Sequence, residues 1–201
     1  MKVFEGNWVA AAAMLGAILV SAPALAQAPA AAAPQAKPDV STFDDWQVRC
    51  FPVQSPSPCD MFQEQGYQRT NQRILSISVA YVPGLDRYAL QISVPLDIAI
   101  PKGVTIQTDS YTSPAMRYRR CDRNGCYVEM GADKNLIESI VRSSPDGKGK
   151  VNIVADNGRS VGIPFSLKGL AAAHDDMVSK AKAKAKPISQ QNTAAPAAPQ
   201  Q

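Results

Sequence analysis

The chain has 201 residues, with 21 lysines and arginines against 17 aspartates and glutamates, one histidine and four cysteines. A single histidine excludes a histidine-rich metal site, and the sequence contains neither a P-loop nor a dinucleotide-binding fingerprint. The excess positive charge lies mainly near the C-terminus, because residues 39–172 carry 15 basic and 14 acidic side chains. This nearly neutral central part argues against nucleic acid as a partner.

The N-terminal residues have the pattern of a cleaved signal peptide. Lys2 precedes a mostly apolar run over 8–20, and Ala24-Leu25-Ala26 is a small-x-small sequence that signal peptidase accepts. The run is short for a transmembrane helix, and a Pro/Ala-rich stretch follows it instead of a basic flank. We therefore expect a signal peptide at 1–26, a linker at 27–38 and no transmembrane segment in the mature chain. The expected location is the periplasm, with outer-membrane association or secretion as alternatives.

The middle of the chain alternates apolar and polar residues with the period of a β-strand. In RILSISVAYV (73–82) and RYALQISV (87–94) every second residue is apolar, and Pro83-Gly84 between them indicates a turn. These runs predict an antiparallel hairpin over 73–94. Shorter alternating runs follow the same period at Trp46/Val48/Cys50, Val104/Ile106, Cys126/Val128/Met130, Val151/Ile153 and Val161/Ile163/Phe165. Many short strands separated by Gly and Pro predict an all-β domain over 39–172, an antiparallel sandwich or barrel.

Two helices interrupt the β pattern. Asp133 is positioned to cap a short helix after the late cysteine pair, with an apolar stripe at Leu136, Ile137, Ile140 and Val141. A second, weaker helix is expected near the C-terminus, so that 173–201 forms a basic Lys/Ala helix and a disordered tail. The single histidine, His174, is expected to be a solvated residue of this helix.

The four cysteines, Cys50, Cys59, Cys121 and Cys126, form an even set in a chain that we expect to be exported, which favours disulfides. Three pairings are possible, and local spacing favours Cys50–Cys59 and Cys121–Cys126. In the second pair, DRNG would form a hairpin loop that places the two cysteines opposite each other. Zinc fits less well because eight residues separate Cys50 from Cys59, whereas zinc knuckles use about two to four. Neither pair has the C-x-x-C form of a thioredoxin-type redox site.

An arginine cluster surrounds the late cysteines. The segment MRYRRCDRNGCY contains Arg117, Arg119, Arg120 and Arg123. On a strand, Arg117 and Arg119 would share one face, and Arg120 would join Tyr118 on the other. Guanidinium groups bind carboxylates and phosphates, so this cluster is the candidate surface for an acidic glycan, a lipid headgroup or an acidic protein. The alternative is an edge hairpin whose charges prevent pairing between sheets.

No set of catalytic residues is apparent in the sequence. A Ser-His-Asp site would have to use His174, and no G-x-S-x-G elbow is present to hold a serine. We therefore expect a protein that is not an enzyme and that has no metal and no cofactor. A hydrolase built from carboxylates on distant strands is the alternative.

Four segments, in this order, carry a family resemblance: FDDWQVRC (43–50), PCDMFQ (58–63), ISVPLDIAIPKGVTIQTD (92–109) and RRCDRNGCYVEM (119–130). Together they resemble the invasion-associated locus B family across most of 43–170. Asp97 stands where that family usually has glycine. The resemblance implies an immunoglobulin-like β-sandwich that Gram-negative bacteria export, an association with host-cell invasion in some pathogens, and no catalytic residues.

These observations predict an exported, non-enzymatic envelope or surface protein. It would act by binding an unidentified protein or an anionic envelope partner, and would contribute to host-cell invasion as the resemblance implies. The alternative is a structural periplasmic protein whose basic tail contacts peptidoglycan or anionic lipid.

Overall fold

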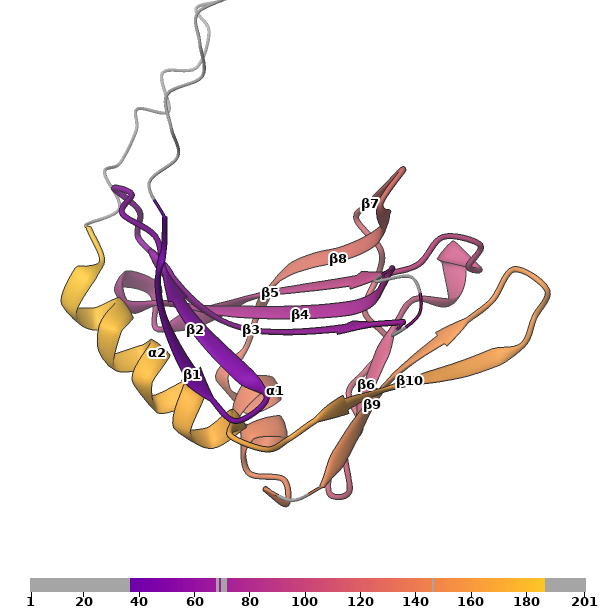
Figure 1. Cartoon of the computed structure of the whole chain (residues 1–201). Helices are drawn as coiled ribbons and strands as arrows, with labels where there is room; N and C mark the ends of the chain where they lie inside the picture. Colours follow the sequence, from indigo (N-terminus) through magenta and orange to yellow (C-terminus); the bar gives the residue numbers. More distant parts are fainter. Residues whose placement is uncertain (1–36, 68, 70–71, 146, 187–201) are drawn as a thin grey trace, which may run out of the picture. The chain divides into compact units, whose positions relative to one another are not determined.

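A computed structural model describes residues 37–67, 69, 72–145 and 147–186 of the chain. The expected signal peptide at 1–26, most of the expected linker at 27–38 and the expected tail beyond 186 lie outside these residues. The described part forms two antiparallel β-sheets and two α-helices (Figure 1). The expected all-β sandwich, with a short helix after the late cysteines and a C-terminal helix, is confirmed.

The larger sheet has seven strands, whose neighbours follow chain order from β1 to β5 before β8 and β7 complete it. These strands are β1 (Asp39–Phe43), β2 (Trp46–Cys50), β3 (Cys59–Gly66), β4 (Arg73–Val82), β5 (Arg87–Val94), β7 (Arg120–Asp122) and β8 (Gly125–Ala132). The expected hairpin over 73–94 is present as β4 and β5, joined by the 3₁₀ turn η1 (Pro83–Leu85).

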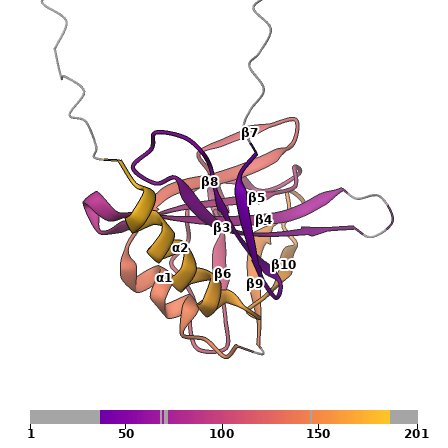
Figure 2. The same cartoon turned by 60° about the vertical axis from the view of Figure 1, so that its left-hand side comes forward.

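The smaller sheet has three strands in the order β10-β9-β6. Its members are β6 (Thr105–Gln107), β9 (Lys148–Val154) and β10 (Ser160–Ser166), and the 3₁₀ turn η2 (Ile100–Lys102) leads into β6. This sheet and both helices, α1 (Lys134–Val141) and α2 (Leu170–Lys184), lie on the same side of the larger sheet (Figure 1). Figure 2 shows the two helices next to each other on that side.

Alternation along the strands gives the larger sheet one buried and one open face. The buried apolar side chains of β4 and β5 occur at every second position: Leu75, Ile77, Val79, Tyr81, Tyr88, Leu90, Ile92 and Val94. They form one core with Ile106 of β6, Ile137 of α1 and Phe165 of β10. The intervening residues, such as Ala89 and Gln91, are exposed on the opposite face. We call this second surface the open face, because none of the described elements covers it.

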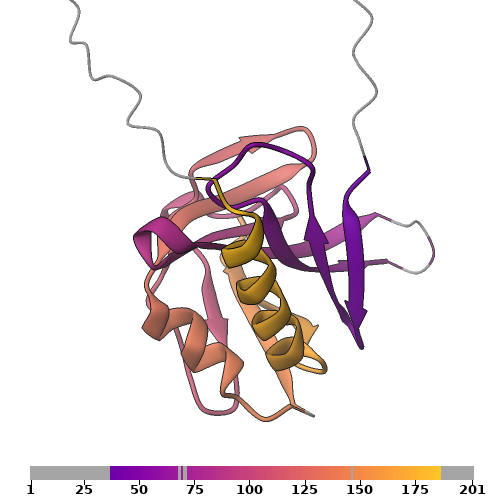
Figure 3. The ribbon, with the colours of Figure 1, turned by 90° about the vertical axis from the view of Figure 1, so that its left-hand side faces the viewer.

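Helix α2 belongs to the folded unit, which differs from the expectation that the domain ends at 172. Its buried residues, Leu170, Ala173, Met177 and Ala181, recur every three or four positions and so lie on one side of the helix. That side packs against β2, β3 and β4 (Figure 3). The expected boundary therefore falls inside a packed helix. The apolar period was hard to recognise in the sequence because two of its four members are alanines.

Asp133 occupies the N-cap position of α1, but its side chain caps no backbone group. Its carboxylate instead accepts a hydrogen bond from Arg87 Nη2 at 2.6 Å. The expected side-chain cap is therefore wrong, and the apolar stripe that buries Ile137 and Ile140 is what holds the helix. Among the described residues, no helix is long and apolar enough to cross a membrane.

If α2 is part of the fold, shortening a buried side chain on it must destabilise the domain. Met177 is fully buried, so we expect Met177→Ala to lower the free energy of unfolding by about 2–5 kcal/mol. Urea unfolding with intact disulfides measures this change. The control is Ser179→Ala at an exposed position of the same helix, which should change stability by less than about 0.5 kcal/mol. Equal effects of the two substitutions would show that α2 does not stabilise the domain.

Candidate functional site

The cysteine hairpin formed by β7 and the start of β8 lies at one edge of the larger sheet. Cys121 faces Cys126 in the register, and a disulfide joins them. A second disulfide joins Cys50 to Cys59, which face each other across β2 and β3. This is the pairing that local spacing favours, and none of the four cysteines is free.

Gly125 allows the hairpin to lie close to the end of β5. Its φ of +143° is one that side-chain-bearing residues rarely adopt, and an added Cβ would lie 2.4 Å from the carbonyl oxygen of Val94. Any other residue at this position would push the hairpin away from β5. The glycine therefore positions the arginines relative to the sheet.

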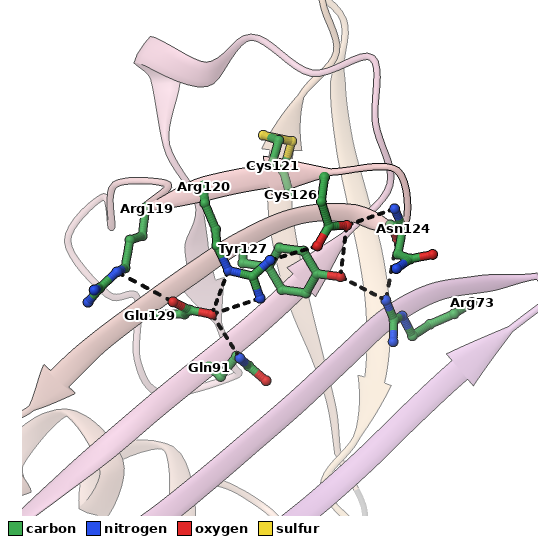
Figure 4. A network of polar contacts seen from close by, with 10 residues as sticks. Arg73, Gln91, Arg119, Arg120, Cys121, Asn124, Cys126, Tyr127 and Glu129 are labelled. Atoms are coloured by element: carbon green, nitrogen blue, oxygen red, sulfur yellow. Dashed lines mark hydrogen bonds and ion pairs between the residues drawn. A yellow bond between two sulfur atoms is a disulfide. The ribbon is translucent and has the colours of Figure 1, made fainter. Parts of the chain in front are cut away.

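Two of the four predicted arginines are engaged by carboxylates on the open face. Glu129 Oε1 lies 3.1 Å from Arg120 Nη2, and Glu129 Oε2 lies 3.5 Å from Arg119 Nε. Arg120 Nη1 also contacts Asp122 Oδ2 at 2.7 Å, and Gln91 donates to Glu129 at 3.0 Å (Figure 4). Solvent screens these exposed ion pairs, so they add little stability and their main effect is to neutralise and orient the two arginines.

The prediction that Arg120 and Tyr118 lie on the same face of a strand is wrong. Arg120 lies over the ring of Tyr127, with its guanidinium carbon 3.9 Å from the ring centroid, and does not join Tyr118 (Figure 4). The physical reason is that β7 begins only at Arg120, so Arg117 to Arg119 do not alternate as in a strand. Within β7, Arg120 pairs directly with Tyr127 of β8, which places both on the same face.

Asp122 fixes the turn of the hairpin. Its carboxylate accepts a hydrogen bond from the backbone N–H of Asn124 at 2.8 Å and contacts Arg120. The Asn124 N–H, followed by Arg120, holds the pKa of Asp122 below its usual value. The carboxylate therefore stays charged at neutral pH.

Arg117 and Arg123 are exposed, and neither makes an ion pair or side-chain hydrogen bond with the described residues. They are the members of the cluster whose positive charge is available to a partner. A third arginine, Arg73, lies with Arg123 at the hairpin tip. Its Nη2 donates to the Asn124 carbonyl oxygen at 3.3 Å and to Tyr127 Oη at 3.4 Å (Figure 4).

Sequence reasoning missed Arg73 because 51 positions separate it from Asn124. The one available signal was its place at the open end of the expected 73–94 hairpin. In the structure, β4 pairs with β5 and β5 pairs with β8, so the start of β4 and the start of β8 lie at the same end of the sheet.

Two hollows border the cysteine hairpin. The tip hollow, of about 570 Å³, is lined by Arg73, Leu96, Asp97, Arg123, Asn124 and Tyr127. The base groove, of about 730 Å³, is lined by Arg117, Tyr118, Arg119, Glu129, Met130 and Leu136. Both volumes fall in the range of small-molecule sites. Of the arginine cluster, Arg123 lines the tip hollow, Arg117 and Arg119 line the base groove, and Arg120 lines neither.

His174 is not the solvated residue that the sequence suggested. Its Nε2 lies 2.7 Å from Tyr88 Oη, its Nδ1 lies 3.0 Å from Asp175, and its side chain is 13% exposed. His174 therefore helps to attach α2 to β5. Among the described residues, no group of three or more histidine, cysteine or acidic side chains is arranged to hold a metal ion.

Comparison with known proteins identifies a family and a fold. The profile of the invasion associated locus B (IalB) protein family matches residues 46–178. The crystal structure of invasion associated protein B from Bartonella henselae superposes with a TM-score of 0.58 and 21% sequence identity, covering 71% of this chain and 98% of that one. No curated protein matches the chain. The structural likeness supports the two-sheet fold.

The base groove contains a tyrosine with an unusual hydroxyl. Tyr118 Oη is buried and has no hydrogen-bond partner in the described structure, and burial raises the pKa of Tyr118 to about 12. We expect Tyr118→Phe to match or exceed the wild type in free energy of unfolding at about pH 7, because it removes an unpaired buried polar group.

Tyr118→Phe should also lose less stability than the wild type as the pH rises above neutrality. Burial keeps the pKa of Tyr118 in the folded protein, about 12, above the value of about 10 in the unfolded chain. The stability that depends on the protonated Tyr118 hydroxyl is therefore complete below about pH 10 and is lost as pH rises through about 12. Urea unfolding at about pH 7 and about pH 11 measures both effects. The exposed Tyr67→Phe is the matched control. If the free energy of unfolding falls as much between about pH 7 and about pH 11 in Tyr118→Phe as in the wild type, Tyr118 is not the source of that loss.

Proposed function

The chain belongs to the invasion associated locus B family, and on this basis we propose that it is an exported, non-enzymatic envelope or surface protein that acts by binding. Its partner is an anionic component of the envelope or of a host-cell surface, and its role is to contribute to host-cell invasion. The candidate contact surface is the arginine cluster at the cysteine hairpin, in particular Arg117 and Arg123.

Export is supported by two independent features. The N-terminal residues have the pattern of a signal peptide over 1–26. The two disulfides suit an oxidising compartment, in which such bonds form and persist. The proposed location is the periplasm, with outer-membrane association or secretion as alternatives.

The observation that carries the proposal is the unequal use of the four arginines. Glu129 and Asp122 neutralise Arg119 and Arg120, whereas Arg117 and Arg123 stay exposed without a partner among the described residues. An edge hairpin that needed charge only for solubility would not require two concave surfaces beside these side chains. The unpaired arginines and the adjoining hollows together support binding of an anionic group.

The basic-tail alternative has less support. Lys180 pairs with Asp176 and donates to Ser41 Oγ, and Lys184 lies 3.2 Å from Asp39. These two lysines are thus engaged with the folded unit and are less available to peptidoglycan or lipid. The remaining residues of the expected tail, 187–201, lie outside the described structure.

Removing the two unpaired charges should weaken binding. We expect Arg117→Ser/Arg123→Ser to adsorb less to anionic envelope fractions and host-cell membranes than the wild type. The difference should shrink as salt rises, because exposed charges are screened within about 8 Å at physiological ionic strength. A sedimentation assay across a salt series measures adsorption.

The matched control for this experiment is Lys148→Ser/Lys168→Ser. It removes the same charge from exposed positions beside a separate hollow that includes Asp45. Equal loss of adsorption in the two double variants would mean that net charge alone matters. That result would contradict a specific role for the arginine cluster.

Glu129→Gln tests the same proposal through a variant that should increase adsorption. It removes the carboxylate shared by Arg119 and Arg120 while keeping a side chain of similar shape that can still bond to Gln91. We expect this variant to adsorb more strongly than the wild type at low salt, because Arg119 loses its carboxylate partner and Arg120 keeps only Asp122. Adsorption equal to the wild type in the same sedimentation assay would show that the neutralised arginines lie outside the contact surface.

A further inference from the structure

Three charged side chains surround the tip hollow without pairing with one another. Arg73 and Arg123 supply two positive charges, and Asp97 supplies one negative charge. Among the described residues, none of the three has an oppositely charged partner within ion-pair distance. Each of the three is therefore available for charge-assisted hydrogen bonds with a ligand in the hollow.

Arg73 is held in an orientation that suits a ligand. One guanidinium nitrogen, Nη2, is bonded to the Asn124 carbonyl oxygen and to Tyr127 Oη. The other guanidinium nitrogens make no hydrogen bond in the described structure. Because the side chain is already ordered by neutral groups, it would lose little conformational entropy on binding a carboxylate through its free edge.

Asp97 sets the charge that the hollow accepts. Two arginines and one aspartate give a net charge of +1, which suits a ligand with one negative charge better than a dianion. The Asp97 carboxylate can accept hydrogen bonds from hydroxyl groups but would repel a second ligand charge. Leu96 is 44% exposed at the same hollow and offers an apolar contact to the C–H face of a ring.

We propose that the tip hollow binds a sugar acid, a hydroxyl-bearing ring with one carboxylate. Arg73 and Arg123 bind the carboxylate, Asp97 and Asn124 bind the hydroxyl groups, and Leu96 packs against the ring. The inference rests on the proposed binding role of the arginine cluster and specifies the ligand class of one of its two hollows. The volume of about 570 Å³ accommodates one or two sugar rings.

The test uses glucuronate as the probe and glucose, acetate and inorganic phosphate as comparison ligands. NMR titration of the full folded protein measures the binding of each. We expect glucuronate to bind with a dissociation constant near 1 mM, and glucose and acetate to bind about tenfold more weakly. Arg73→Gln and Arg123→Gln should each weaken glucuronate binding about tenfold or more. Lys168→Gln, at an exposed position beside the separate hollow that includes Asp45, should leave it unchanged.

Asp97→Gly is the sharpest variant. The φ of Asp97 is +63°, which glycine adopts without strain, so the backbone should be retained. Loss of this carboxylate should weaken glucuronate binding and strengthen phosphate binding, a reversal that general loss of structure would not produce. Backbone NMR spectra that match the wild type away from the hollow establish that each variant is folded.

Glucuronate that binds no better than glucose and acetate would overturn the inference. An unchanged affinity in Arg73→Gln would do the same. If adsorption to anionic surfaces depends on Arg117 and Arg123 while glucuronate does not bind, the sugar-acid inference fails and the proposed function stands. If glucuronate binds as expected while adsorption ignores these arginines, only the charge-based proposal fails.

Sugar acids occur in both bacterial polysaccharides and host glycans. Desulfated uronate-containing oligosaccharides from each source, titrated into the same protein, distinguish them. Tighter binding of one set supports the inference and identifies the source. Failure of both sets to compete with glucuronate for the hollow overturns it.

Discussion

The antiparallel pairing of β8 with β5 is the constraint on which both the core and the candidate site depend. The register runs from Tyr88 opposite Ala132 to Val94 opposite Cys126. It buries Val128 between the two sheets and places Glu129 on the open face, because successive residues of a strand alternate. A slip of one residue would exchange these two environments and bury a carboxylate without a partner. The buried face therefore fixes the position of every charged group on the open face.

The same pairing decides which positive charges are available. The sequence places four arginines within seven residues, and their number alone suggests a strongly basic hairpin. The fold brings Glu129 beside Arg119 and Arg120, so half of that charge is neutralised within the protein. It also brings Arg73 to the hairpin tip from a distant strand. The candidate binding surface is therefore a product of strand order and differs from the basic segment seen in the sequence.

Local patterns in the sequence predicted most of the strands, the short helix and the local cysteine pairing, because period-two alternation and short loops act between near neighbours. The strands β1 and β3 were not among the expected runs. Features that depend on tertiary contacts were missed. Asp133 bonds to Arg87 instead of capping its helix, and α2 packs through two alanines and a methionine that carry little hydrophobic signal. Arg73 entered the site only through strand pairing. No local rule could have predicted these contacts, since their partners lie 46 or more positions apart or in another layer.

Asp97 shows how a backbone requirement and a ligand preference can coincide. A left-handed backbone at this position favours glycine, and aspartate is among the few other residues that tolerate it. The turn is held by the Asp156 N–H, which donates to the Asp97 carbonyl oxygen at 3.0 Å, so the side chain is not needed to form the turn. The carboxylate, which the backbone does not require, lines the same hollow as Arg73 and Arg123 and so adds one negative charge to two positive ones. If the hollow binds a sugar acid as proposed, the Asp97 carboxylate would determine which anions it accepts, whereas the backbone of the turn does not depend on that side chain.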